Sequence, residues 1–257
     1  MAKTIIELRG VCKKFGKHVV YKDMDLQVRE GETLTVIGGS GQGKSVCLKL
    51  ITGLLKAEEG DVLVDGEEVG DMNADRLSRL RRRLSMVFQG GALFDSMNVL
   101  ENVGYALKEH TKMSDAEILA RALECLELVG LGSDPNLIYR MPASLSGGMR
   151  KRVAIARSIA IKPEVILYDE PTTGLDPMNC NVIAHMILKL QRELGVTSIV
   201  VTHEMPLAFE VSDRIAMLHD KHFPFQGTPD ELHRMSEPAV KDFIEGRVEE
   251  GDEGHGA

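Results

Sequence analysis

The 257-residue sequence contains no tryptophan, and aromatic residues make up only 4% of it. No apolar run approaches the roughly 18 residues that indicate a membrane-spanning helix, so we expect any membrane contact to come through other proteins. The start, MAKTIIELRG, lacks the basic and then apolar pattern of a secretory signal. Together these absences predict a chain that stays in the cytoplasm.

Cysteine is also scarce, and basic residues are outnumbered by acidic ones. The four cysteines, Cys12, Cys47, Cys125 and Cys180, form no C-x-x-C pair and have no histidine at metal-ligand spacing. We therefore expect reduced, buried thiols, although oxidation of Cys47, just past a glycine-rich loop, is an alternative that would block that loop. Acidic residues outnumber basic ones by 39 to 31, and the net charge of −8 argues against general nucleic-acid binding.

What is present suffices for a large core. With 43% hydrophobic residues, the chain can bury the core of one domain, or of one domain with a sizeable insertion. The N-terminal residues alternate as half-buried strands do, and residues 61–69 are typical of a hairpin that turns at Asp65-Gly66. Asn73 is placed to cap a helix. The arginines of that helix, at 79 and 81–83, are expected to form a solvated face.

Residues 90–150 have a helical pattern, in which Ser114 and Glu117 form an S-x-x-E capping box ahead of an apolar stripe. The members of that stripe are Ile118, Leu119, Ala122, Leu123 and Leu126. Beyond residue 150, apolar strands alternate with helices, which predicts a mostly parallel sheet covered by helices. The acidic, glycine-containing tail has no apolar anchor and is expected to be disordered.

A glycine-rich sequence, GGSGQGKS at residues 38–45, follows an apolar run and satisfies the G-x-x-x-x-G-K-[ST] pattern of a phosphate loop. Such a loop opens a helix whose N-terminus offers backbone N–H groups and a positive dipole end. Lys44 can reach the β- and γ-phosphates, and the Ser45 hydroxyl can ligate Mg²⁺. The expected ATP-binding residues around the loop are Gly38, Gly39, Ser40, Gly41, Gln42, Gly43, Lys44, Ser45 and Val46.

The sequence VILYDE at residues 165–170 is an apolar strand that ends in two carboxylates. Asp169, at the strand end, can hold Mg²⁺ directly or through water. Glu170 points elsewhere, because successive strand residues face opposite sides. An Asp-Glu pair is often only a surface turn, but its place after VILY and before Pro171 favours a functional pair.

Between these motifs lies LSGGM, at residues 145–149, and a histidine follows at 203. A phosphate loop, LSGG, a strand ending in Asp-Glu and then a histidine, in that order, resemble the nucleotide-binding subunits of ABC transporters. The resemblance extends over about residues 11–243 and implies an ATPase that uses ATP and Mg²⁺.

The resemblance also implies roles for individual residues. Glu170 is expected to be the general base, and His203 to contact the γ-phosphate. Gln89 is expected to ligate Mg²⁺ and water, so that the metal set is Ser45, Gln89 and Asp169. Phe15 matches the residue that stacks on adenine, with Val20 completing an apolar wall.

Ser146, Gly147 and Gly148 open another helix and so form a second anion-binding helix end. Two such ends in one domain make sense if each serves a different ATP. By resemblance, this signature faces the γ-phosphate bound by a second copy of the chain, and Asp176 belongs to a D-loop that runs along the dimer interface. The chain is therefore expected to act as a homodimer.

The run GGALFDSMNVLENV, at residues 90–103, closely resembles the ATPase subunits of Mce-associated lipid transporters of the Mla type. This implies phospholipid transport between inner and outer membranes by a dimer bound to a multi-span permease, on the cytoplasmic side of the inner membrane. Apolar side chains at Ala92, Leu93, Phe94 and Met97 are expected to dock the permease, and ordinary helical packing is the alternative. An Mce-domain protein is a further expected partner, and a small regulatory subunit is left open.

The predicted fold is α/β, a RecA-like P-loop NTPase core with an antiparallel β subdomain and an inserted helical subdomain. Residues 1–247 form the ABC ATPase domain, with the core and β subdomain in 1–89 and 151–247, the helical subdomain in 90–150, and the disordered tail in 248–257. The alternatives are a soluble ABC ATPase that acts as an assembly or scaffold factor, and a transporter ATPase for another substrate. A nucleic-acid repair ATPase would need long insertions that the chain does not hold.

Overall fold

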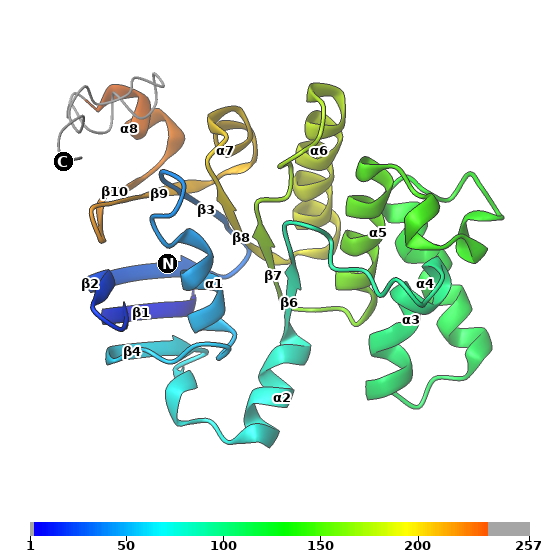
Figure 1. The fold of residues 1–257 in the computed structure, drawn as a ribbon, viewed down its shortest axis with the longest axis horizontal. Coiled ribbons are helices and arrows are strands. Elements are labelled where there is room, and N and C mark those ends of the chain that lie inside the picture. Colours follow the sequence, from blue (N-terminus) through cyan, green and yellow to red (C-terminus); the bar gives the residue numbers. More distant parts are fainter. Residues whose placement is uncertain (1–2, 236–257) are drawn as a thin grey trace, which may run out of the picture.

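Two sheets lie side by side in the computed structural model, which describes residues 3–235 (Figure 1). The first is antiparallel, in the order β2-β1-β4-β5. Its strands are Thr4–Phe15 (β1), His18–Arg29 (β2), Glu59–Val64 (β4) and Glu67–Glu68 (β5). The second has the order β10-β9-β3-β8-β7-β6, and every neighbouring pair is parallel except β9 and β10. Its strands are Thr33–Ile37 (β3), Leu84–Val87 (β6), Val165–Asp169 (β7), Thr197–Thr202 (β8), Arg214–His219 (β9) and His222–Gly227 (β10).

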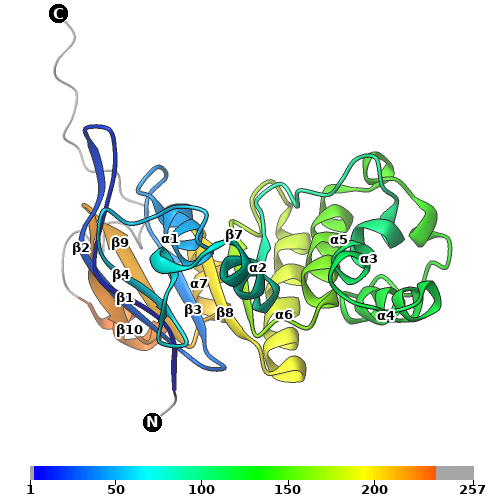
Figure 2. The same ribbon diagram turned by 90° about the horizontal axis from the view of Figure 1, so that it is seen from below.

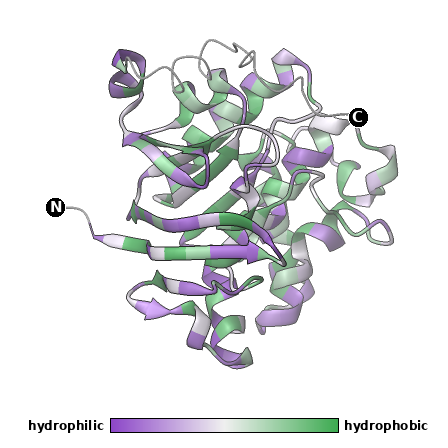
Figure 3. Cartoon of the chain, turned by 60° about the vertical axis from the view of Figure 1, so that its left-hand side comes forward, coloured by the Kyte–Doolittle hydropathy of each residue, from purple (hydrophilic) through white to green (hydrophobic). Residues whose placement is uncertain are grey.

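The antiparallel sheet follows from alternating side chains. Ile6 pairs with Val28 and Leu8 with Leu26, and all four side chains are buried between the two sheets. Figure 3 shows the same alternation as hydrophilic and hydrophobic bands along these strands. The predicted hairpin is confirmed, because β4 and β5 are joined through Asp65 and Gly66, both with positive φ.

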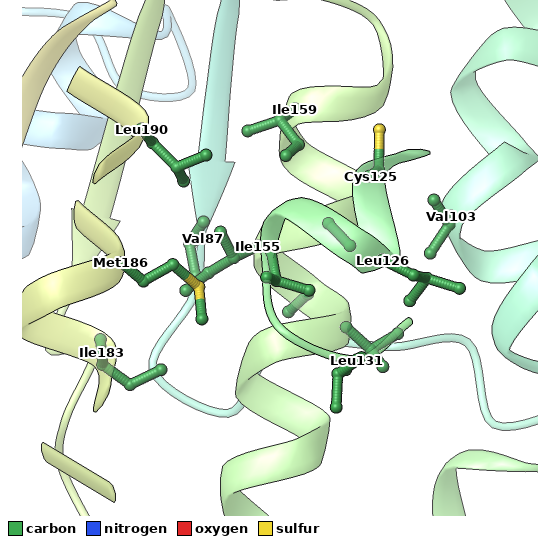
Figure 4. Close-up of a cluster of buried hydrophobic side chains, with 14 of the residues drawn as sticks. Val87, Val103, Cys125, Leu126, Leu131, Ile155, Ile159, Ile183, Met186 and Leu190 are labelled. Carbon is green, nitrogen blue, oxygen red and sulfur yellow. The ribbon is translucent and has the colours of Figure 1, made fainter. Parts of the chain in front are cut away.

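The parallel sheet is buried on both faces, so its strands are apolar throughout. In β7, Val165 and Leu167 face the core that contains the antiparallel sheet, whereas Ile166 and Tyr168 face the core formed by the long helices. Figure 4 shows part of the second core, in which Val87 of β6 lies beside Ile155 and Met186. The prediction of a mostly parallel sheet covered by helices is therefore confirmed, with β10 as an antiparallel addition that was not predicted.

The helices are distributed unevenly around the sheets. They are Lys44–Ile51 (α1), Ala74–Arg83 (α2), Val99–His110 (α3), Asp115–Leu128 (α4), Gly147–Ala160 (α5), Pro177–Leu194 (α6), Met205–Val211 (α7) and Pro229–Arg234 (α8). Short 3₁₀ turns occupy Val69–Asp71, Leu137–Tyr139 and Pro142–Ser144. In Figure 2, α3 and α4 lie at the end of the molecule opposite β1 and β2, with α5 beside them. None of the helices in residues 3–235 is both long and apolar enough to cross a bilayer.

Two sequence expectations about helix faces were wrong in part. The Ser114–Glu117 capping box forms as predicted, but Leu123 is 44% exposed because it lies at the edge of the apolar stripe. The arginines of α2 are not simply solvated. Arg81 donates to the carbonyls of Thr52 and Gly53, and Arg83 forms ion pairs with Asp65 and Glu164. The predicted tail, residues 248–257, lies outside the described residues.

Candidate active site

The functional motifs meet because their strands are parallel neighbours. The phosphate loop follows β3, His203 follows β8, Asp169 and Glu170 end β7, and Gln89 follows β6. Parallel pairing places all four carboxyl ends at one edge of the sheet, where α/β proteins bind ligands. A cavity of about 290 Å³ opens at this edge. Its lining residues are Ser40, Gly41, Gly43, Lys44, Ser45, Val46, Gln89, Glu170 and His203.

Close backbone approach explains the glycines of the loop. A Cβ at Gly38 would lie 2.5 Å from the carbonyl oxygen of Leu218, and Gly43 has a φ of 102° with no room for a Cβ beside Val20. The buried Tyr21 hydroxyl donates to the Gly43 carbonyl at 2.6 Å. Tyr21 of β2 therefore supports the phosphate loop, a contact that sequence reasoning did not predict.

The Lys44 ammonium lies over its own loop. It donates to the carbonyls of Gly38 and Gly39 at 2.9 and 3.0 Å, and lies 3.5 Å from Oε1 of Glu170. Its side chain is 6% exposed, so its charge acts in a site largely shielded from water. This arrangement holds one fixed positive charge at the N-terminus of α1, where the helix dipole also favours an anion.

A hydroxyl and a carboxylate meet beside this charge. Ser45 Oγ donates to Asp169 Oδ1 at 2.6 Å, which joins the start of α1 to the end of β7. Gln89 lines the same cavity. These are oxygen ligands of the kind that hard divalent cations prefer.

Glu170 is the most constrained residue of the site. Its φ of 48° is left-handed, a conformation that costs a non-glycine residue on the order of 1–3 kcal/mol. The Oε2 atom lies 2.9 Å from His203 Nδ1 and accepts a hydrogen bond from the Thr173 hydroxyl at 3.2 Å. A buried carboxylate is thus held by Lys44 on one side and by His203 and Thr173 on the other.

The expected base-binding residues lie apart from this cavity. Phe15, at the end of β1, is 47% exposed, and the ammonium of Lys13 lies 5.1 Å from its ring centroid. Val20 is buried, and with Gln42 it lines an adjoining cavity of about 510 Å³ that also includes Ser40 and Gly41. Phe15 therefore presents an open aromatic surface, as an adenine platform requires.

The signature residues do not line the phosphate-loop cavity of their own chain. Ser146 caps α5 through a 3.2 Å bond from Met149 N–H to its hydroxyl, and Asp176 caps α6 in the same way through Asn179. The start of α5 and the start of α6 pack closely together: a Cβ added at Gly148 would lie only 2.5 Å from Oδ1 of Asn179. The signature and the D-loop therefore form one surface.

The buried Asn102 side chain orders the later part of the segment after Gln89. The amide of Asn102 bonds to both backbone groups of Phe94 and to the carbonyls of Met97 and Asn98. Of the four predicted docking residues, Ala92 and Phe94 are exposed, whereas Met97 is half-buried and Leu93 packs partly against the helical core.

A groove of about 490 Å³ adjoins this segment between α3 and α4, and the exposed Tyr105 is one of its lining residues. The ring of Tyr105 packs against that of Phe94, with the centroids 4.8 Å apart. The groove contains apolar side chains from both helices, among them Leu100 and Leu119, and charged side chains also line it: Glu101, Lys108, Glu109 and Asp115. An apolar surface therefore continues from the segment after Gln89 onto the helical part.

The cysteines are unpaired thiols in residues 3–235. Cys47 and Cys125 are buried as expected, but Cys12 and Cys180 are only partly buried. Burial raises the pKa of Cys47 to about 12, so almost none of it is the reactive thiolate at neutral pH. The structure therefore favours an inert structural role for Cys47.

Sequence reasoning missed three residues that order the site: Tyr21, Asn102 and Lys151. Lys151 is buried on α5 and donates to the backbone carbonyls of Gln89 and Glu170. A lysine one helical turn past the signature, within an otherwise apolar helix face, is the only signal that the sequence offers for it. Tyr21 and Asn102 look like ordinary strand and helix residues.

Comparisons with a family model, with related sequences and with solved structures all give the same family. A family model described as ABC transporter matches residues 21–173. The intermembrane phospholipid transport system ATP-binding protein MlaF of Escherichia coli is 38% identical over 242 residues, which cover 94% of this chain and 89% of that protein. The probable ribonucleotide transport ATP-binding protein mkl of Mycobacterium leprae is 39% identical over 242 residues, which cover 94% of this chain and 69% of that protein.

Solved structures agree with the fold. The dimeric post-hydrolysis structure of the ATP-binding cassette MJ0796, bound to ADP and Pi, has a TM-score of 0.80 and 36% identity, and the match covers 88% of this chain and 99% of that one. The structure of cbiO1 from Clostridium perfringens, part of the ABC transporter complex cbiONQ, has a TM-score of 0.82 and 28% identity, with coverage of 93% and 94%.

Proposed function

Since this chain belongs to the ABC transporter family and is an ATPase of that family, we propose that it powers phospholipid transport between the inner and outer membranes. In this proposal two copies of the chain bind a multi-span permease on the cytoplasmic side of the inner membrane. The observation that carries the lipid assignment is the similarity to MlaF, which extends over 94% of this chain and 89% of that protein. An Mce-domain protein completes the proposed assembly.

The proposed chemistry follows from the geometry of the site. Lys44 and the N-terminus of α1 bind the phosphates, and the carboxylate of Glu170 accepts a proton from the attacking water or orients it. His203, bonded to Glu170, contacts the γ-phosphate, and Phe15 stacks on the base beside Val20. Each of these roles is a proposal supported by the position of the residue.

Mg²⁺ is the proposed metal, and the residues present fit it. Ser45 and Asp169 are within hydrogen-bond distance of each other, and Gln89 lines the same cavity, so the protein offers a small set of oxygen donors. Mg²⁺ is commonly bound by one or two protein ligands together with substrate phosphates and water. When bound, it would neutralise phosphate charge.

Dimerisation is supported by the position of the signature. Ser146, Gly147 and Gly148 lie at the N-terminus of α5 but outside the cavity of their own phosphate loop. The helix end is thus available to the ATP of a second copy, and Asp176 would lie along that interface. The structural relative MJ0796 is described as a dimer in its ADP- and Pi-bound state.

The permease is proposed to dock on the exposed aromatic pair Phe94 and Tyr105 and on the groove beside them. Contiguous apolar surface of this kind marks an interaction site more often than it marks free surface. This surface also counts against the soluble scaffold alternative, which needs no permease-docking face. The second candidate is a transporter ATPase for ribonucleotides, because mkl carries that description at a similar identity.

Co-purification tests the docking half of the proposal. We expect the full-length chain to purify from detergent-solubilised membranes with a multi-span protein, and Phe94→Ala/Tyr105→Ala to reduce the yield of that protein at least tenfold. The matched control is Val182→Ala/Leu194→Ala, which removes exposed apolar side chains from α6 instead. Full recovery of the partner by the aromatic variant would show that this face is not the docking site.

A reconstituted complex tests the substrate. In proteoliposomes, we expect ATP to drive the movement of a fluorescent phospholipid, and Glu170→Gln to stop it. Movement of a labelled ribonucleotide without lipid movement would select the second candidate. A chain that purifies with no membrane protein would favour the scaffold role.

A further inference from the structure

Helix α5 contacts the active site of its own chain through one buried lysine. Lys151 lies one turn beyond the signature and is 6% exposed. Its ammonium donates to the backbone carbonyl of Gln89 and, at 3.2 Å, to that of Glu170. These two carbonyls follow neighbouring strands β6 and β7, so a single side chain joins both strand ends to the helix.

The cost of this arrangement indicates that the bonds matter. Burial lowers the pKa of Lys151, against the charges of Glu170, Glu204 and Asp169, which act to raise it. A buried ammonium costs stability unless its hydrogen bonds are satisfied, and here the bonds go to backbone carbonyls rather than to a carboxylate. An aliphatic side chain of similar size would pack without that cost, so the directed donors are what lysine adds.

The hydrogen bond from Lys151 to Glu170 acts on a residue whose backbone conformation is unfavourable. Its left-handed φ of 48° must be held by its surroundings, because the conformation is unfavourable for a residue with a Cβ. The Glu170 N–H donates to the carbonyl of Val201 at 2.9 Å, and Lys151 holds the carbonyl on the other side. Without Lys151, the Glu170 carbonyl would keep the longer 3.4 Å bond from the Thr173 N–H, whereas the N–H side of the residue would stay held at 2.9 Å.

A second contact from the same helix supports this link. Arg157 donates to the carbonyls of Gly91 and Ala92 at 3.0 and 2.8 Å, and Ala92 also has a positive φ, of 46°. Helix α5 therefore holds the chain at Gln89 and again two to three residues later. Ser146 caps the start of α5. If this helix moves, the backbone of Gln89 must move with it or these bonds must break.

We propose that Lys151 is a positioning residue that transmits the position of the signature helix to the backbone of Glu170 and Gln89. The inference rests on the proposed roles of those two residues. When a second copy engages Ser146 at the start of α5, Lys151 would hold Glu170 and Gln89 in the arrangement for hydrolysis. The effect should thus fall on the rate of hydrolysis and not on ATP affinity.

The test compares three substitutions in the full-length chain by steady-state ATPase kinetics and by titration with a fluorescent ATP analogue. We expect Lys151→Met to lower kcat at least tenfold, with KM and analogue affinity within threefold of the wild type. Lys151→Arg keeps charged donors and should recover most of kcat. Lys189→Met is the matched control, because Lys189 also donates to a backbone carbonyl, that of Leu128, and neither residue lines the active-site cavity.

A double variant separates this inference from the proposed function. If Lys151 acts through Glu170, Lys151→Met should lower activity little further in a Glu170→Gln background. Wild-type turnover in Glu170→Gln would overturn the proposed base, whereas an inactive Glu170→Gln beside a fully active Lys151→Met would overturn the role of Lys151 alone. A raised KM with unchanged kcat would also overturn it. Should Lys151→Met fail to fold, Lys151→Gln replaces it. Its neutral amide donor lies one bond closer to the backbone, so kcat should fall below that of Lys151→Arg with KM within threefold, and a wild-type kcat would overturn the role of Lys151.

Discussion

At the residue scale, the chemistry of this site depends on a carboxylate with three neighbours. Glu170 lies 3.5 Å from the ammonium of Lys44 and is bonded to His203 and Thr173. An amide in its place would keep the shape and much of the hydrogen bonding but would lose the basicity.

We therefore predict that Glu170→Gln lowers kcat by roughly 10²–10⁴-fold, the usual contribution of a general base, while ATP affinity changes little. The variant should also accumulate an ATP-bound dimer, because binding contacts remain when hydrolysis stops. Phosphate release and size-exclusion chromatography with ATP measure the two effects. Glu193→Gln, on the exposed side of α6, is the control, and equal rates in the two variants would refute the role of Glu170.

The motif residues could be located from sequence because each combines a distinctive residue type with a simple local element. Asp169 ends an apolar strand, His203 directly follows one, and Lys44 begins the helix after the glycine-rich loop that follows another. Tyr21 and Lys151 could not be found in this way, since their role depends on which carbonyl the folded chain brings to them. No local pattern contains that information.

At the element scale, the end of α5 is stabilised by a residue from another helix. Arg121 of α4 is buried and donates to the carbonyls of Ile159 and Ala160 at 2.8 and 3.1 Å, while its Nη1 pairs with Glu124. The last carbonyls of a helix have no partners within the helix, so side-chain donors must satisfy them where they are buried.

Arg121→Met should lower the free energy of unfolding by about 1–3 kcal/mol, the cost of leaving the buried Ala160 carbonyl unpaired. The Ile159 carbonyl would keep its 3.1 Å bond from the Lys162 N–H. Urea denaturation of the full-length chain measures this change. Arg140→Met breaks an exposed pair with Asp134 and should cost no more than about 1 kcal/mol. Equal denaturation midpoints for Arg121→Met and the wild type would mean that water satisfies the Ala160 carbonyl.

Elements with strong caps and periodicity were predicted well, including the hairpin at Asp65 and the capping box at Ser114. Prediction failed where a face depends on its neighbours. Leu123 has the spacing of a core residue but lies at the edge of the packed surface, and β10 contains Pro224, a residue that is unusual within a strand. Helix α8 was missed although Thr228 and Glu231 form a capping box, because the helix is only six residues long.

At the scale of the whole molecule, the proposed composite site gives a prediction about assembly. Ser146→Asp keeps a good helix cap, since aspartate caps as well as serine does, but it places a carboxylate where the γ-phosphate of the second copy would lie. We expect ATP binding by the monomer to persist and the ATP-dependent dimer to be lost. Analytical ultracentrifugation in a Glu170→Gln background measures this.

Ser146→Thr is the matched control and should dimerise normally. The more obvious Gly148→Asp is a poorer test, because any Cβ at Gly148 collides with Asn179 of the same chain. If Ser146→Asp dimerises with ATP as strongly as Ser146→Thr, the signature does not contact the nucleotide of a second copy.

The order of strands in the larger sheet bears on which part of the site can open. The phosphate loop, His203 and Glu170 follow β3, β8 and β7, each bonded to strands on both sides, whereas in the described sheet β6 is an edge strand bonded to β7 alone. Local opening costs least where the fewest backbone bonds must break. Amide protons near Gln89 should therefore exchange with solvent sooner than those of the three inner strands. Opening of β6 costs the fewest sheet bonds, and the bond from Lys151 to the Gln89 carbonyl is what ties this edge to the rest of the site.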